Sequence, residues 1–141
     1  PTRSPYTTFD PFKIEVWEDY PKGLYEMAMF VKDRYGIPSI ITENGSADTG
    51  PENLAPSYLA RHVQWLKKAR HDGADVRGYF YWTLMDNYEW NHGMNVRMGL
   101  YAVDKDDAQK ARTMRPAGDV YSKIVRANDV PADVQTSYPI E

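Results

Sequence analysis

The chain has 141 residues, enough for one ordinary domain, and its hydrophobic fraction of 42% and charged fraction of 26% are typical of a soluble globular protein. Its 17 basic and 20 acidic residues leave a net charge of -3, which argues against nucleic acid and anionic membranes as partners. The absence of cysteine excludes disulfides and thiolate metal sites and fits a cytoplasmic protein. No apolar run approaches the roughly 20 residues that a membrane span needs.

The first predicted element after a loop over residues 1–19 is a helix. Pro21 suits the first position of a helix, and apolar residues follow it at helical spacing. Gly36 is placed as a C-terminal cap, and the proline two residues later prevents continuation. We therefore expect a helix over residues 21–35.

A strand, a loop and a second helix are predicted next. The β-branched run over residues 39–42 is typical of a strand that is covered on both faces. Residues 45–56 are rich in Gly, Pro, Asn and Asp and predict a loop. Ser57 is expected to cap a second helix, which ends near Gly73.

The C-terminal half begins with an aromatic strand over residues 76–82, followed by a long loop over 85–98. Residues 99–103 predict a short extended segment, and residues 128–141 are expected to be irregular. Between them a last helix should begin at Pro116 and turn four residues inward, namely Val120, Tyr121, Ile124 and Val125.

This alternation of helices and strands predicts an α/β fold with a parallel sheet and helices outside it. Two parallel strands alone leave unpaired backbone edges and an uncovered apolar face. A closed barrel of eight such units needs about 250 residues. We therefore expect the chain to supply the last two β/α units of a larger barrel.

Acidic and aromatic residues stand at the C-terminal ends of both predicted strands. Glu43 follows the first, and Trp82, Glu89 and Trp90 follow the second. Neighbouring parallel strands deliver these residues to one edge of the sheet, where a barrel carries its chemistry, so they should converge. Two plainer interpretations remain: Glu43 caps a turn or pairs with a surface Arg, and Trp82 packs in the core.

The residue types fit a sugar pocket. Retaining glycosidases use two carboxyl groups about 5–5.5 Å apart. Asp86 and Glu89 lie on an aromatic loop that is better suited to holding hydroxyls, and the ionised Glu89 can accept two hydrogen bonds from neighbouring ones. Trp90 offers an indole N–H, and Trp82 a flat face for stacking.

Residues 41–45, Ile-Thr-Glu-Asn-Gly, and 82–90, Trp-Thr-Leu-Met-Asp-Asn-Tyr-Glu-Trp, resemble the C-terminal signature of glycoside hydrolase family 1. That family comprises retaining β-glucosidases, β-galactosidases and relatives on a (β/α)8 TIM barrel. The similarity extends over most of residues 20–125, with supporting stretches at 20–25, 34–38, 58–62, 73–79 and 97–100. It implies that residues 1–141 are the C-terminal portion, about strands 7 and 8, of one TIM-barrel catalytic domain whose N-terminal portion is absent from this chain.

The resemblance also implies roles for four residues. Glu43 would be the nucleophile that forms the covalent glycosyl-enzyme, and Trp82 would form the floor of the glycone subsite. Glu89 would bind the O4 and O6 hydroxyls, and Trp90 the O3 hydroxyl. Relatives that act on 6-phosphorylated sugars replace the Glu-Trp pair, so the intact pair favours an unphosphorylated sugar.

Residues 91–93 and Met98 differ from the amino acids that are commoner in the family at these positions, which leaves glucose, galactose and fucose open as the glycone. No Asn-Glu-Pro motif is present for the acid/base glutamate. The isolated chain is therefore expected to be inactive, and a companion N-terminal chain or segment would complete the site. No cofactor and no metal are expected: His62 is interpreted as a helix packing residue, and the other two histidines, His71 and His92, lack ligand partners at a useful spacing.

The sequence thus predicts a β-glycosidase, when assembled, that hydrolyses terminal β-linked glucosides or galactosides with retention. Its substrate would be a β-glycoside, and neither nucleic acid nor a membrane is expected as a partner. Two alternatives stay open. One is a non-catalytic sugar-binding or scaffold protein derived from the same fold; the other is an unrelated small α/β domain whose acidic residues form surface pairs.

Overall fold

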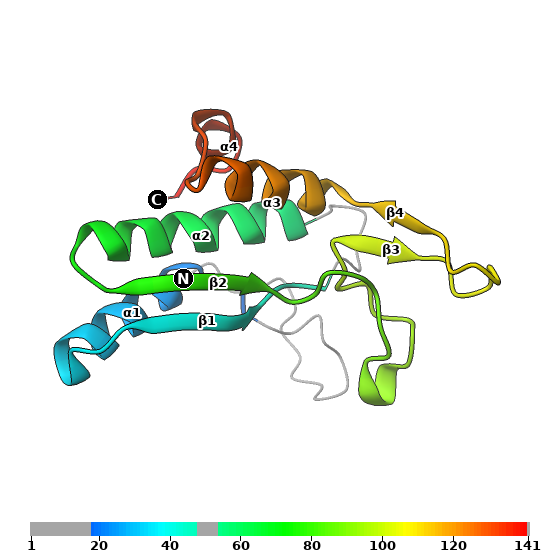
Figure 1. The fold of residues 1–141 in the computed structure, drawn as a ribbon, viewed down its shortest axis with the longest axis horizontal. Coiled ribbons are helices and arrows are strands. Elements are labelled where there is room, and N and C mark those ends of the chain that lie inside the picture. The colour runs from blue at the N-terminus through cyan, green and yellow to red at the C-terminus, as the bar shows by residue number, and fades with distance from the viewer. Residues whose placement is uncertain (1–17, 48–53, 141) are drawn as a thin grey trace.

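The computed structural model of the chain describes residues 18–47 and 54–140 (Figure 1). Two β/α units come first and are followed by a β-hairpin and two helices. In chain order the elements are α1 (Lys22–Tyr35), β1 (Ser39–Asn44), α2 (Ala55–His71), β2 (Val76–Tyr81), the 3-10 turn η2 (Trp90–His92), β3 (Tyr101–Val103), β4 (Arg112–Met114), α3 (Pro116–Ala127) and α4 (Ala132–Ser137). None of the helices in the described ranges is long and apolar enough to cross a membrane.

The helix predicted over residues 21–35 is confirmed. Gly36 ends it in the left-handed conformation, with φ 62°, and its N–H donates to the carbonyls of the last turn. The predicted cap of α2 is wrong, because the helix begins at Ala55 and Ser57 lies inside it. Pro56 explains the earlier start: a proline in the first turn loses no helical hydrogen bond, and its fixed φ suits the helix.

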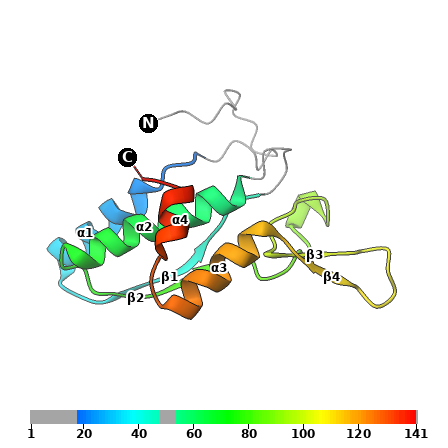
Figure 2. The same ribbon diagram turned by 90° about the horizontal axis from the view of Figure 1, so that it is seen from above.

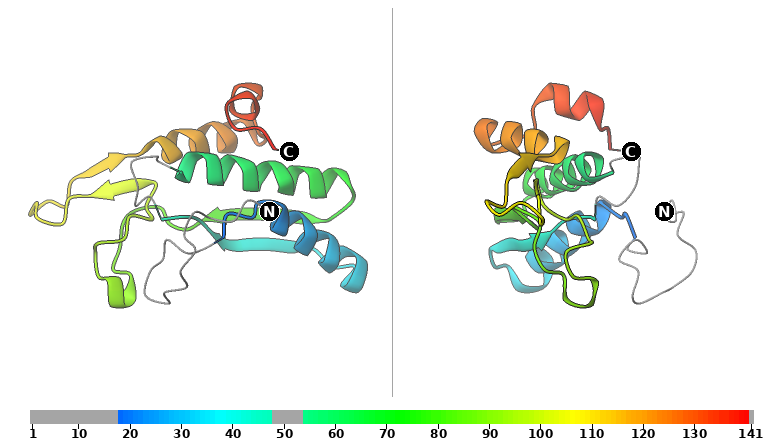
Figure 3. Two further views of the ribbon diagram at one scale, coloured as in Figure 1. Left: turned by 180° about the vertical axis from the view of Figure 1, so that it is seen from behind. Right: turned by 90° about the vertical axis from the view of Figure 1, so that its right-hand side faces the viewer.

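Strands β1 and β2 pair in parallel, as predicted, and helices α1 and α2 cover one face of the pair (Figures 2 and 3). The other face carries Ile40 and Phe80, which expose 54% and 59% of their surface. Among the described residues these two strands pair only with each other. The sheet therefore has an uncovered apolar face and open edges.

Buried side chains lie where the helices meet the sheet and one another. One cluster joins α1 and α2 to β2 and comprises Ala28, Leu66, Ala69, Ala74 and Val76. Another joins α2 to α3 and α4 and comprises Leu59, Ala60, Val120, Ile124, Val130 and Val134. The predicted inward position of Val125 is wrong: it is 59% exposed, because the next residue along a helix is turned about 100° from Ile124.

A groove of about 1040 Å³ lies between β2, α2 and α3. The side chains of Val76 and Tyr79 line it from the strand, and those of Tyr121 and Ile124 line it from α3. Space is therefore left beside β2, between this strand and the two helices.

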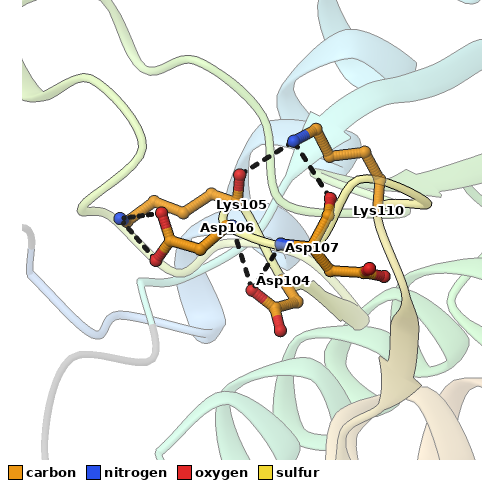
Figure 4. Close-up of polar contacts among 5 residues, drawn as sticks. All are labelled: Asp104, Lys105, Asp106, Asp107 and Lys110. Atoms are coloured by element: carbon orange, nitrogen blue, oxygen red, sulfur yellow. Dashed lines mark hydrogen bonds and ion pairs between the residues drawn. The ribbon is translucent and has the colours of Figure 1, made fainter.

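The C-terminal third holds a strand that the sequence did not predict, β4, and the predicted irregular tail over residues 128–141 is wrong, because it contains helix α4. The predicted extended segment is confirmed as β3, which pairs antiparallel with β4. Hydrogen bonds within the chain hold the hairpin tip (Figure 4): a carboxylate oxygen of Asp104 accepts the backbone N–H groups of Asp106 and Asp107, and Lys110 Nζ donates to the carbonyl of Lys105. The acidic side chains here stabilise a turn.

Candidate active site

The C-terminal ends of β1 and β2 lie side by side, as the sequence analysis predicted. The backbone N–H of Trp82 donates to the carbonyl of Asn44 at 3.0 Å. The next residue, Gly45, is so close that a Cβ there would overlap the carbonyl oxygen of Trp82. Glycine is therefore required in the Thr-Glu-Asn-Gly segment because the two strand ends touch there.

Glu43 is exposed at this strand end. Its side chain makes no hydrogen bond or ion pair with any residue in the described part of the chain, so neither plain interpretation, a turn cap or a surface pair, is found there. The carboxylate is accessible to a ligand.

Asn44, in contrast, is held on both sides of its amide. Its Nδ2 donates to the hydroxyl of Tyr58 at 3.1 Å, and its Oδ1 accepts from the hydroxyl of Tyr79 at 2.8 Å. Tyr58 lies on α2 and Tyr79 on β2, so three elements meet directly behind the candidate nucleophile. The sequence analysis missed this contact, although Asn44 lies in its signature segment 41–45 and both tyrosines lie within its supporting stretches.

The loop after β2 is anchored at its start by an ion pair that the sequence analysis also missed. Arg115 donates two hydrogen bonds to Asp86, both at 2.7 Å, and the Gly99 N–H donates a third at 2.9 Å. Burial disfavours the charged form of Asp86, but the hydrogen bonds from Arg115 and Gly99 outweigh it and lower the pKa below its ordinary value. Asp86 is thus a structural residue of the loop, and the earlier suggestion that it holds sugar hydroxyls is wrong.

Glu89 and Trp90 stand at the tip of the same loop. The Glu89 N–H donates to the carbonyl of Gly93 at 2.7 Å, which closes a tight turn around η2. Trp90 has a φ of 40° and is 82% exposed, whereas Glu89 and Trp82 are partly buried. The exposed indole of Trp90 and the partly buried carboxylate of Glu89 lie on a closed turn and can meet a ligand without unfolding anything.

His62 packs in the interior, as the sequence predicted. His62 is 3% exposed, its ring stacks on Tyr58 with centroids 3.7 Å apart, and burial lowers its pKa to about 4. His71 is exposed, and its Nδ1 lies 3.0 Å from a carboxylate oxygen of Asp72. Within residues 18–47 and 54–140 there is no group of three or more side chains that could bind a metal ion.

The strand ends and the loop thus form one polar edge of the molecule. Glu43 lies at the end of β1, Trp82 directly follows β2, and η2 lies beyond the C-terminal ends of both strands (Figure 1). Carboxylate and indole groups at the C-terminal end of a parallel sheet can bind and attack a sugar.

Solved structures with this arrangement are β-glycosidases. The chain matches the β-glycosidase from Pyrococcus horikoshii with a TM-score of 0.80 and 40% identity, over 89% of this chain and 29% of that one. It matches the β-glycosidase from Thermosphaera aggregans with a TM-score of 0.80 and 38% identity, over 90% of this chain and 26% of that one. Over most of its length the chain therefore has the fold of a part of these β-glycosidase TIM barrels.

The sequence comparisons agree. A β-galactosidase from Sulfolobus acidocaldarius is 40% identical over 119 residues, and a benzoxazinyl glucoside β-D-glucosidase from Triticum aestivum is 41% identical over 122. The matches cover 84% and 79% of this chain but 24% and 21% of those proteins, so the chain spans about a quarter of the length of the curated relatives it matches. Residues 7–130 match the family described as glycosyl hydrolase family 1, and the chain belongs to that family.

Proposed function

We propose that this chain forms about strands 7 and 8 of a (β/α)8 barrel and carries the nucleophile and part of the sugar subsite of a retaining β-glycosidase. The observation that carries the proposal is the exposed Glu43 at the end of β1, hydrogen-bonded through its neighbour to the strand end that bears Trp82. The relatives are β-glycosidases, which act on β-linked sugars.

A companion N-terminal chain or segment would complete the barrel. Three features support this part of the proposal: the exposed face around Ile40 and Phe80, the open edges of the sheet, and the groove beside β2. A further parallel strand beside β2 would fill the space under α3 and pair the open backbone groups. The acid/base carboxyl group would come from that companion, so the chain alone would not turn over substrate.

The mechanism is a double displacement. Glu43 attacks the anomeric carbon while the companion's acid protonates the leaving oxygen, and water then hydrolyses the glycosyl-enzyme with the same group as base. Trp82 would stack on the glycone, Glu89 would accept hydrogen bonds from O4 and O6, and Trp90 would bind O3. The intact Glu89–Trp90 pair favours an unphosphorylated glucoside or galactoside.

The first test is a chimera in which this chain replaces the matching segment of the Pyrococcus horikoshii β-glycosidase. We expect the chimera to hydrolyse aryl β-glucosides or β-galactosides and the isolated chain to be inactive. Glu43→Gln, which keeps the size of the side chain, should lower kcat by at least about 10,000-fold, since it removes the nucleophile.

The alternative is a non-catalytic sugar-binding or scaffold protein, and the same chimera distinguishes it. Isofagomine lactam, the ligand bound in a family 1 β-glucosidase from Thermotoga maritima, is the binding probe. A chimera whose melting temperature rises with the lactam but which does not hydrolyse the aryl glycosides would favour the alternative. Turnover that is unchanged in Glu43→Gln would contradict the proposed nucleophile.

A further inference from the structure

The backbone around Glu43 is not fixed by regular strand pairing. In the ladder between β1 and β2, Ile41 is opposite Tyr79 and Asn44 is opposite Tyr81, so two residues on β1 lie opposite one residue on β2. Thr42 and Glu43 lie inside this irregularity. A β-bulge leaves its extra residue without a ladder position, and other contacts must set where its side chain points.

Asn44 is the first residue after the irregularity, and its side chain is bound where the ladder is weakest. Tyr58 accepts from Nδ2 at 3.1 Å, and the Tyr79 hydroxyl donates to Oδ1 at 2.8 Å and lies 3.3 Å from the Asn44 carbonyl. An amide held by a donor and an acceptor cannot rotate without losing both hydrogen bonds.

Both hydroxyls are themselves held in place. The Tyr58 ring stacks on buried His62, whose Nδ1 lies 2.7 Å from the Tyr58 carbonyl oxygen. The Tyr79 ring packs between the two principal buried clusters of the molecule. Burial raises the pKa of both phenols, so both remain neutral hydrogen-bonding groups at any pH at which a glycosidase works.

We propose that Tyr58 and Tyr79 are positioning residues: by holding the amide of Asn44 between them, they fix the backbone that aims the Glu43 carboxylate. This inference rests on the proposed function of Glu43. Neither tyrosine touches substrate. Their hydroxyls contact Asn44, which is partly buried, whereas the preceding residue, Glu43, is exposed.

The test uses the chimera described above with Tyr58→Phe and Tyr79→Phe. Each variant should lower kcat about tenfold and leave KM within about twofold, because misaiming a reacting group by a fraction of an ångström slows the chemical step and spares binding. The matched control is Tyr25→Phe, since that hydroxyl bonds Asp72 at the other end of α2. It removes the same kind of hydrogen bond and should leave kcat unchanged.

Asn44 supplies a second set of variants in case a tyrosine variant folds poorly. Asn44→Asp can accept hydrogen bonds from both tyrosine hydroxyls, so its kcat should stay within about threefold of the parent at the best pH. The acidic limb of its pH–rate profile should move to higher pH, because a second carboxylate beside Glu43 raises the pKa of the nucleophile. Asn44→Leu should lower kcat about as much as a double variant that combines Tyr58→Phe with Tyr79→Phe. Adding Tyr79→Phe to Asn44→Leu should lower kcat little further.

Equal kcat in Tyr79→Phe and Tyr25→Phe, or equal kcat and pH limb in Asn44→Asp and Asn44→Leu, would overturn the positioning role. Either result leaves the proposed function standing as long as Glu43→Gln remains inactive. An active Glu43→Gln chimera would overturn both.

Discussion

The two halves of the candidate site are built differently. The end of β1 is fixed from behind: Asn44 is bonded to two tyrosine hydroxyls and to the N–H of Trp82. The loop after β2 is anchored at its base, by the side chain of Asp86 and by backbone hydrogen bonds of Thr83 and Leu84. Its tip presents Trp90 with 82% of its surface exposed. The comparison indicates that the proposed nucleophile is preorganised, whereas the groups proposed to hold the sugar lie on an exposed turn that the rest of a barrel would cover.

The strongest way to break the first half is Gly45→Ala. A methyl group there would overlap the Trp82 carbonyl, which belongs to the neighbouring strand end, so we expect a loss of at least about 3 kcal/mol in the free energy of unfolding and loss of turnover in the chimera. The matched control is Gly36→Ala, where only the positive φ resists substitution and no atom lies within 4 Å. It should cost about 1 kcal/mol. Similar losses in urea unfolding for the two variants would contradict the close contact of the strand ends.

Breaking the Asp86–Arg115 ion pair, which anchors the loop after β2, should lower the free energy of unfolding nearly as strongly. Asp86→Asn removes the charge that neutralises Arg115, whose side chain is 13% exposed, so we expect a loss of about 3 kcal/mol in the free energy of unfolding. Asp75→Asn is the control, since its partner Arg77 also forms a forked pair but is 62% exposed. That pair should be worth no more than about 1 kcal/mol. Equal losses from the two variants in urea unfolding would contradict the anchoring role of the Asp86–Arg115 pair.

The exposed tip should behave in the opposite way, with an effect on catalysis and none on stability. Glu89→Gln in the chimera should lower kcat/KM about 100-fold, because a charged acceptor of two hydroxyl hydrogen bonds is lost. The melting temperature should not change, because the Glu89 side chain has no partner among the described residues. Tyr88→Phe is the control on the same turn, at a position 72% exposed. A fall in melting temperature for Glu89→Gln would show that its role is structural.

The smallest expected effect is a pH dependence of the free energy of unfolding. It comes from His62, which stacks on Tyr58 near the end of β1. The pKa of His62 is lowered to about 4, below its unfolded value near 6.5, so the unfolded chain binds a proton that the folded chain does not. The free energy of unfolding should therefore fall as the pH drops from about 6.5 toward 4, by about 1 kcal/mol between pH 7 and 5.5. His62→Phe keeps the stacking and removes the titration. A pH slope in urea unfolding that persists in this variant would assign it to another group.

The same contrast explains what the sequence could predict. Elements with a local signal were found: α1 between Pro21 and Gly36, and β1 and β2 from their apolar runs. The short elements β4 and α4 were missed, because three exposed strand residues and a six-residue helix carry no clear periodicity.

The contacts that hold the site were missed for a different reason. Arg115 is 29 residues from Asp86, and Tyr79 is 35 from Asn44, so neither pair has a spacing that a sequence pattern reveals. Motif resemblance led to Glu43, Trp82, Glu89 and Trp90, but it could not identify the residues that support them. Those depend on how α2 and α3 pack against the sheet.

The account is tested most directly by trapping the glycosyl-enzyme. The chimera would be reacted with a 2-deoxy-2-fluoroglycosyl fluoride, a substrate whose electron-poor sugar slows hydrolysis of the intermediate, and the labelled peptide identified by mass spectrometry. We expect one sugar per protein, attached to the peptide that contains Glu43, and no labelling of Glu43→Gln. A label on any other carboxylate, or turnover without a label at Glu43, would contradict the central claim.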